Sequence, residues 1–398
     1  MRINVLGWAK GMISRRALFQ ALAASALLPG TSLCAQGRAL ATPIALQEDR
    51  IWIAATIGGS RPLQFIIDTG ATISLIQEGL ARELEMRERG RARLVGIGGA
   101  ENFLLYVGRD VAFSSGVIQR SVAFGAMPPE LVLGREAAGL FAAGLFTGAD
   151  SDLDFSRSEW RYYPDGRGAR DGYRELPSTI QHVGGNGNGS AYVMVDAVLD
   201  GNSYRFLLDT GMPGQVMLWS TATRRSGLWN DAAPFAPSRG AGIGGLGDRG
   251  RLVRAGSLRI GDFAFDRPLV FLNPPSSYQR ASTVDGIIGL NFLELLNLST
   301  DVRRGKLWAQ PSGRPQRPRH YGMSGLWAEE RHDGLEIVDL SPRSPAAEAG
   351  LQRGDEIVGL TMDQFARRAG GRPGDSFELS YRRGGETRTT RLTLREFL

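Results

Sequence analysis

Alternating apolar and polar positions predict a β-rich chain in which one arrangement of elements occurs twice. Residues 51–76 read as a strand, a glycine-containing turn, a second strand and another apolar run, and residues 191–218 repeat that order. In both copies the second strand ends in Asp-Thr-Gly, at Asp68 and at Asp209. These residue types are ordinary turn formers, so one copy would indicate only a turn. The second copy requires a further explanation.

Three more patterns recur in the same order after each Asp-Thr-Gly. They are a Gly-Ile-Gly-Gly stretch, an apolar-apolar-Gly stretch and a hairpin-like segment that contains an aspartate. A fixed order of recurring elements indicates an internal repeat. We therefore expect two related lobes, lobe 1 over residues 42–166 and lobe 2 over residues 167–312. The matched segments are 96–99 with 242–245, 131–141 with 286–296, and 152–163 with 299–310.

The last part of the chain has a different pattern. The Pro- and Arg-rich residues 313–319 read as a linker. Beyond it, residues 320–398 predict a compact β-rich module with one short helix, which Ser344 begins as N-cap and Gly350 ends. Strands are expected at 334–340 and 356–360, and a hairpin at 377–394 turning at Gly384 and Gly385.

The N-terminus adds an export signal to this picture. Arg15 and Arg16 directly precede a short apolar run over residues 17–28, as in twin-arginine signals. We expect residues 1–41 to be such a signal and the mature protein to be periplasmic or secreted in a bacterium. The apolar run is too short for a stable membrane span. A short buried helix is the alternative. Cys34 is the only cysteine, so cleavage after it would exclude a cysteine nucleophile.

Composition excludes several function classes. Hydrophobic residues make up 42% and charged residues 22% of the chain, as in ordinary globular proteins, and the net charge of +6 is modest. The arginines are not interleaved with aromatic residues, so no nucleic-acid partner is expected. The three histidines, His182, His320 and His332, show no metal-ligand spacing. Residues 240–245 match G-x-G-x-x-G but lack the flanking strand and helix of a dinucleotide site. No metal or cofactor is expected.

The repeated Asp-Thr-Gly is best explained by two carboxyl groups that meet. Close carboxylates cannot both ionise, so one pKa falls while the other rises, and one carboxylate can then activate water while the other donates a proton. The aspartic-protease dyad is the standard example of this behaviour. A threonine hydroxyl can hydrogen-bond to the opposite lobe, and glycine lets the backbones approach closely.

These motifs together resemble the retropepsin-like aspartic proteases, over residues 42–312. The resemblance implies a mostly β, two-lobed acid-protease β-barrel pseudo-dimer that works as a monomer on peptide or protein substrates. It assigns catalysis to Asp68 and Asp209, and support of the dyad to Thr69, Gly70, Thr210 and Gly211. It also implies substrate-covering flaps at Ile97, Gly98, Gly99, Ile243, Gly244 and Gly245.

Residues 344–360 resemble the helix-turn-strand core of PDZ domains, which predicts a PDZ domain over residues 320–398. The resemblance implies that the backbone of Gly325, Leu326 and Trp327 receives a protein C-terminus. The alternative is a domain that packs against the lobes and binds no free ligand.

Two functions follow from the sequence. The first is an aspartic endopeptidase assisted by PDZ recognition of a substrate or partner. The alternative is a catalytically inactive peptide-binding or adaptor protein of the same fold. Met212 motivates the alternative, because it follows the second Asp-Thr-Gly where the family usually has Ala, Ser or Thr.

Overall fold

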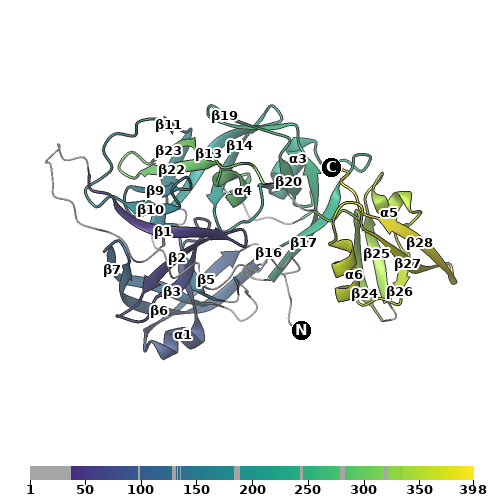
Figure 1. The fold of residues 1–398 in the computed structure, drawn as a ribbon, viewed down its shortest axis with the longest axis horizontal. Helices are drawn as coiled ribbons and strands as arrows, with labels where there is room; N and C mark the ends of the chain where they lie inside the picture. The colour runs from purple at the N-terminus through teal and green to yellow at the C-terminus, as the bar shows by residue number, and fades with distance from the viewer. Residues whose placement is uncertain are drawn as a thin grey trace.

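The computed structural model shows two β-lobes followed by a smaller β-domain (Figure 1). It describes residues 37–398 except 97–98, 128–130, 132, 135, 183–188, 243–244, 278–282, 318–320 and 333. The expected export signal therefore lies largely outside the described residues. Within the described part, no helix is long and apolar enough to cross a membrane. The prediction of a mostly β, two-lobed fold is confirmed.

Lobe 1 is built on a strand order in which β3 and β4 flank β8. Strand β3 runs parallel to β8, β4 runs antiparallel to β8, and β4 is also parallel to β7. The elements of this lobe are β1 (Leu40–Gln47), β2 (Arg50–Thr56), β3 (Leu63–Ile67), β4 (Ser74–Gln77), α1 (Glu78–Glu83), β5 (Arg87–Gly96), β6 (Gly99–Phe113), β7 (Ile118–Met127), β8 (Ala137–Phe141), α2 (Gly144–Thr147), β9 (Ser151–Asp154) and β10 (Glu159–Tyr162).

Lobe 2 repeats the same pairings. Strand β14 is parallel to β21, β15 is antiparallel to β21, and β15 is parallel to β20. Its elements are β11 (Arg174–Glu175), β12 (Ser178–Gln181), β13 (Tyr192–Leu199), β14 (Asn202–Asp209), β15 (Val216–Leu218), α3 (Ser220–Ser226), β16 (Ala236–Gly242), β17 (Gly245–Arg254), β18 (Ser257–Ile260), β19 (Phe263–Asp266), β20 (Leu269–Leu272), β21 (Gly286–Gly289), α4 (Leu290–Leu293), β22 (Leu296–Asp301) and β23 (Lys306–Pro311).

The repeat also explains one glycine in each lobe and refines the sequence alignment. Phe65 pairs with Gly139 and Phe206 pairs with Gly286, three residues before each aspartate. A Cβ at Gly139 would lie 1.9 Å from the Leu75 carbonyl oxygen, and one at Gly286 would lie 2.0 Å from the same atom of Met217. Only glycine permits this crossing. The counterpart of Gly286 is thus Gly139, at the end of the matched segment 131–141 rather than in its opening Leu-Val-Leu-Gly.

Strands from both lobes join in one sheet between them. The order β11-β23-β22-β9-β10-β1 contains a direct pairing of β9 with β22, at Leu153 with Leu298. Arginines of the connecting segment reinforce this junction. Arg167 Nε lies 3.2 Å from the fully buried Asp152, and Arg170 lies 3.1 Å from Asp150. The lobes are therefore not separable units, because the closing hairpin of each pairs with that of the other.

A single apolar core extends through both lobes. It contains fully buried side chains of lobe 1, such as Phe65 and Trp160, together with Phe206 and Phe292 of lobe 2. Burial of one such side chain contributes about 1.5–3 kcal/mol relative to leaving it exposed. The core therefore holds the two lobes in one arrangement around the strand ends that carry the aspartates.

The C-terminal domain is a five-stranded antiparallel sheet with two helices. Its strand order is β24-β25-β26-β27-β28. Ser344 caps α5 and the hairpin turns at Gly384 and Gly385, as expected from the sequence. The second helix was not expected; Thr361 begins it with a capping box. The elements are β24 (Leu326–Arg331), β25 (Gly334–Leu340), α5 (Pro345–Glu348), β26 (Glu356–Val358), α6 (Met362–Ala369), β27 (Ser376–Arg383) and β28 (Glu386–Thr393).

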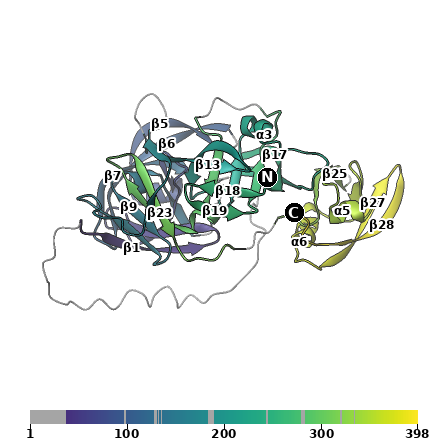
Figure 2. The same cartoon turned by 90° about the horizontal axis from the view of Figure 1, so that it is seen from above.

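This domain packs on lobe 2 at the base of the β16–β17 hairpin (Figures 1 and 2). Tyr321 and Met323 share an apolar cluster with Ala236 of β16, and the Phe235 amide donates a hydrogen bond of 2.9 Å to Ser341 Oγ. The Tyr321 hydroxyl accepts hydrogen bonds from the amides of residues 397 and 398. Residues 313–317 adopt no regular structure, and the domain after them packs against lobe 2.

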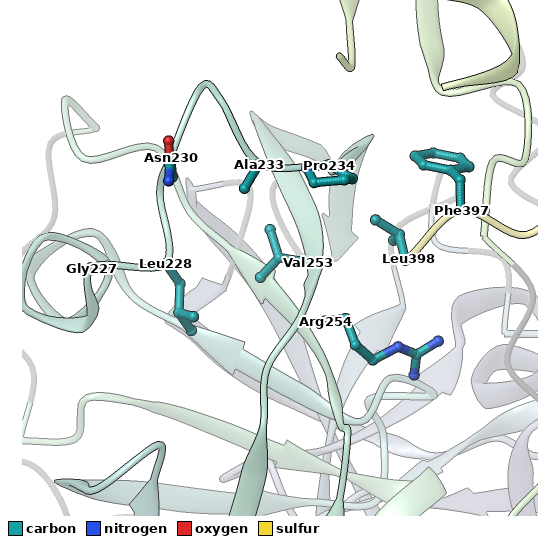
Figure 3. Close-up of a pocket in the computed structure, with 9 residues that line it drawn as sticks. All are labelled: Gly227, Leu228, Asn230, Ala233, Pro234, Val253, Arg254, Phe397 and Leu398. Atoms are coloured by element: carbon teal, nitrogen blue, oxygen red, sulfur yellow. The ribbon is translucent and has the colours of Figure 1, made fainter. Parts of the chain in front are cut away.

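A cavity of about 300 Å³ lies where the C-terminal residues meet lobe 2 (Figure 3). Phe397 and Leu398 form one side of it, and Leu228, Pro234 and Val253 of lobe 2 are among the residues on the other. None of its lining residues belongs to an Asp-Thr-Gly segment. The cavity is therefore a feature of the domain junction and not of the site described next.

Candidate active site

Asp68 and Asp209 meet because their strands end at the junction of the lobes. Asp68 directly follows β3, and Asp209 is the last residue of β14. Each carboxyl group occupies the space left by the glycine of the opposite lobe. A Cβ at Gly70 would lie 2.3 Å from Cγ of Asp209, and one at Gly211 would lie 2.4 Å from Cγ of Asp68. Glycine is thus required at both positions by the facing carboxyl group.

Four hydrogen bonds between Thr69 and Thr210 and the opposite strands fix this approach. The Thr69 hydroxyl donates to the Leu208 carbonyl at 2.8 Å and accepts from the Thr210 amide at 3.0 Å. In the mirrored pair, the Thr210 hydroxyl donates to the Ile67 carbonyl at 2.7 Å and accepts from the Thr69 amide at 3.1 Å. Both threonines are buried. The cross-lobe hydrogen bonding expected of them is therefore present and symmetric.

The two carboxyl groups are not equivalent electrostatically. Burial raises the pKa of Asp68 well above its usual range, and the negative charge of Asp209 raises it further. Burial also raises the pKa of Asp209, but hydrogen bonds to its carboxylate from Gly211, Asp68 and Met212 counteract that rise. Gly211 donates at 2.7 Å and Met212 at 3.1 Å, whereas Asp68 accepts only the Gly70 amide, at 2.9 Å. The arrangement favours a proton on Asp68 that is donated to ionised Asp209.

Two further residues beside the dyad were missed in the sequence. Arg50 and Tyr192 are the first residues of β2 and β13, which are equivalent strands of the two lobes. Burial lowers the pKa of Arg50, while the charges of Asp68 and Asp209 raise it. Burial raises the pKa of Tyr192 to about 12, and its side chain hydrogen-bonds with that of Thr72. The only sequence signal was their matching place at the start of each repeat.

Met212 does not disturb the hydrogen bonding of the dyad. Its amide donates to Asp209, and its side chain packs within lobe 2 against the cluster of Met217, Phe271 and Ile287. A Cβ at Gly289 would lie 2.4 Å from the Gly214 carbonyl oxygen and 2.7 Å from Met212 Cε, so both the backbone and the methionine require glycine there. In lobe 1 the equivalent residue is Ala71, which packs on the corresponding cluster. The structure thus places the bulk of Met212 inside its own lobe.

The expected flaps correspond to two hairpins. Strands β5 and β6 pair as far as Gly96 with Gly99, and β16 and β17 pair as far as Gly242 with Gly245. Gly245 has a φ of 97°, a conformation that favours glycine. Gly99 and Gly245 are thus the first residues of the returning strands. The hairpin tips, Ile97, Gly98, Ile243 and Gly244, lie outside the described residues.

The expected peptide loop of the C-terminal domain is only partly free for a ligand. Gly325 has a φ of 73°, and its amide already donates to the Gly322 carbonyl at 3.0 Å. Leu326 is buried in the domain core, while Trp327 is partly exposed at a bulge in β24. The structure therefore brings these three residues to the start of an edge strand, but it leaves no free amide on Gly325.

The strand arrangement and the facing carboxyl groups define an aspartic-protease-like fold. In agreement, a family model described as "Aspartyl protease" matches residues 53–140 and 195–292, one range in each lobe. Both ranges include the Asp-Thr-Gly segment and the hairpin that follows it.

Comparison with other known proteins adds little to this assignment. No curated protein matches the sequence significantly. Among solved structures, basic 7S globulin from soybean matches with a TM-score of 0.42 at 10% identity, over 69% of this chain and 95% of that one. Conglutin gamma, a basic 7S globulin from lupine seeds, matches over the same shares with a TM-score of 0.41 at 9% identity.

Proposed function

We propose that this protein is an aspartic endopeptidase whose two lobes each supply one carboxyl group of a single catalytic dyad. The observation that carries the proposal is the partly buried Asp68–Asp209 pair, held by the four symmetric hydrogen bonds of Thr69 and Thr210. A partly buried pair of acids costs folding stability. Carboxyl groups with perturbed pKa values in such a pair are typical of catalytic sites.

The geometry suggests a role for each carboxyl group. Ionised Asp209 takes a proton from water, and the resulting hydroxide attacks the scissile carbonyl carbon. Protonated Asp68 donates a hydrogen bond to the carbonyl oxygen and stabilises the negative charge that develops there. Asp209 then passes the proton that it took from water to the leaving amine nitrogen as the C–N bond breaks. The hydrogen bonds from Gly211 and Met212 favour the ionised form of Asp209 that this mechanism needs.

We also propose that the C-terminal domain is PDZ-like and presents protein substrates to the lobes. Two observations support this role: among the described strands β24 pairs only with β25, and its first residues, which precede the Glu329 contact with Arg249 of β17, follow the Gly325 turn. An edge strand of this kind can accept an extended peptide by strand addition.

Substitution of each aspartate tests the catalytic proposal. Asp68→Asn and Asp209→Asn should each lower kcat/KM for a peptide substrate by about 10²–10⁴-fold, because asparagine keeps the shape but cannot exchange the proton. The double variant should lose little more, since the two groups act as a unit. Asp196→Asn, at an exposed aspartate of β13, is the matched control and should retain full activity.

Two results would contradict the proposal. Full activity of Asp209→Asn would show that lobe 2 is structural only. No hydrolysis by wild-type protein across acidic and neutral pH, on a mixed peptide library and with the fold intact, would favour the non-catalytic peptide-binding alternative. A mixture of the two single variants should stay inactive, because both carboxyl groups must come from one chain.

A further inference from the structure

Strand β5, the outer strand of the lobe 1 hairpin, carries a row of exposed arginines. Arg87, Arg89, Arg91 and Arg93 are all exposed, and Glu88 is the one acidic residue on the strand. Within the described part of the chain, none of the four arginine side chains forms an ion pair or a hydrogen bond. Other arginine-rich strands differ: Arg382, Arg383 and Arg388 of the C-terminal hairpin are each paired with a carboxylate.

The same strand lies at the edge of its sheet. Strand β5 ends the strand order of the large sheet and pairs only with β6 among the described strands. Its other side presents backbone groups that an extended chain could pair with. A register shift between Glu88 and Gly90 bends the strand there, so that Arg91 and Arg93 share one face of the sheet while Arg87 lies on the other. Figure 2 shows β5 on the outside of lobe 1, away from the C-terminal domain.

The row also leads toward the expected flap. Beyond Arg93, β5 continues to Gly96, which pairs with Gly99 directly before the tip at residues 97–98. A chain bound along β5 would therefore run beside the hairpin that covers the dyad under the proposed function. The width of one strand suits a single extended polypeptide better than the broad surface of a membrane or a nucleic-acid helix.

We propose that the open edge of β5 is an exosite, a binding site outside the cleft, for an extended acidic segment of the protein substrate. Carboxylates of the segment pair with the guanidinium groups, for which arginine is well suited, and its backbone adds to the sheet edge. The proposal rests on the proposed endopeptidase function for its biological meaning. The binding itself does not require catalysis and can be measured separately.

Binding of labelled octapeptides tests this directly. A fluorescein-labelled peptide of alternating Glu and Thr should bind the full chain in fluorescence anisotropy, and the matched Lys-Thr and Gln-Thr peptides should not. The variant Arg87→Gln/Arg89→Gln/Arg91→Gln/Arg93→Gln should weaken binding by about tenfold or more, from four exposed charge pairs. An increase in salt should weaken wild-type binding and change that of the variant little.

Matched controls separate a site from a general charge effect. Arg367→Gln/Arg368→Gln/Arg372→Gln/Arg391→Gln removes the same charge from four exposed arginines of the C-terminal domain and should leave binding intact. Replacement of the four β5 arginines by lysine keeps the charge and should retain most of the affinity. This second variant also keeps the test valid if the glutamine variant folds poorly.

Steady-state kinetics then test whether the exosite serves the proposed function. Addition of an acidic tail to a short peptide substrate should lower its KM with wild-type protein and not with the glutamine variant, while kcat for the short peptide stays the same. Absent peptide binding, equal loss in the C-terminal control, or binding only of heparin or anionic vesicles would overturn the exosite. Peptide binding without any hydrolysis would overturn the proposed function alone.

Discussion

At the residue scale, the site combines small residues with two costly acids. Gly70 and Gly211 leave space for the opposite carboxyl groups, and Thr69 and Thr210 satisfy backbone groups across the junction. The glycines and threonines fix the geometry of the site, whereas ionisation of a partly buried carboxyl group opposes folding. The dyad is therefore a place where chemistry and stability conflict, and the conflict depends on pH.

This conflict predicts that Asp68→Asn stabilises the protein at neutral pH. Folding raises the pKa of Asp68, so the stability that its protonated form contributes is complete below about pH 4 and is lost as pH rises through the raised pKa. Asparagine cannot ionise. The variant should melt higher than wild type at pH 7.5, by about 2–4 °C for each kcal/mol gained, and nearly equally at pH 3.5.

Calorimetry at the two pH values checks this prediction. The exposed control Asp196→Asn should show no such pH-dependent gain. A gain of the same size at pH 3.5 and pH 7.5 would show that the effect does not come from ionisation of Asp68.

At the scale of elements, the repeated crossing of strands depends on one glycine in each lobe. Gly139 and Gly286 lie where β8 and β21 pass the carbonyl groups of β4 and β15. The neighbouring atoms belong to the backbone of a central strand, so they cannot move aside as a flexible side chain could. The crossing also positions β3 and β14, and with them both aspartates.

Gly139→Ala and Gly286→Ala should each destabilise the protein by about 3 kcal/mol or more, since overpacking of a rigid core costs about 1–3 kcal/mol and here the obstacle is backbone. The control is Gly79→Ala in α1, where an added Cβ meets nothing within 4 Å. That change should be neutral or stabilising by up to about 1 kcal/mol. Urea unfolding midpoints measure all three, and an unchanged midpoint for Gly139→Ala would contradict the packing argument.

Local patterns in the sequence predicted the elements that local physics determines. The Asp-Thr-Gly strand ends, the Ser344 cap and the Gly384–Gly385 turn each depend on a few neighbouring residues. Arg50 and Tyr192 were not predicted, because their nearness to the dyad arises only after the strands assemble. The pairing of β9 with β22 was not predicted either, because it too forms only when the two lobes assemble. Helix α6 was missed because its charged sequence buries only Phe365.

At the scale of the whole molecule, the C-terminal domain and lobe 2 share an interface. Tyr321 packs with Ala236 and Leu269 of lobe 2, and within its own domain its ring lies edge-on to Phe397 at 5.4 Å and its hydroxyl accepts from two amides. Arg249 of β17 and Glu329 of β24 form an ion pair of 3.5 Å across the same junction. The domain thus contacts the hairpin of lobe 2 and leaves β5 of lobe 1 uncovered.

Tyr321→Ala should loosen this interface without unfolding either part. Loss of the ring removes packing against Ala236 and Leu269 of lobe 2, and loss of the hydroxyl releases residues 397 and 398, which line the junction cavity. Together these losses should cost about 2–5 kcal/mol. Limited proteolysis should then cut residues 312–317 faster than in wild type. Tyr321→Phe keeps the ring and should show a smaller effect. Equal cutting rates in Tyr321→Ala and wild type would show that other contacts hold the domain in place.

The pairing of β9 with β22 affects when the two lobes, and with them the aspartate pair, can assemble during synthesis. Thr69 and Thr210, which hydrogen-bond across the lobe junction, are 141 positions apart. The sheet between the lobes also needs β23, which ends at Pro311. A growing chain emerges N-terminus first, and contacts so distant in sequence form late and slowly. Asp68 is made early, but it stays without Asp209 until about half of the 398 residues have been added. Under the proposed function, the chain therefore cannot hydrolyse peptides during the first half of its synthesis, because Asp209 has not yet been made.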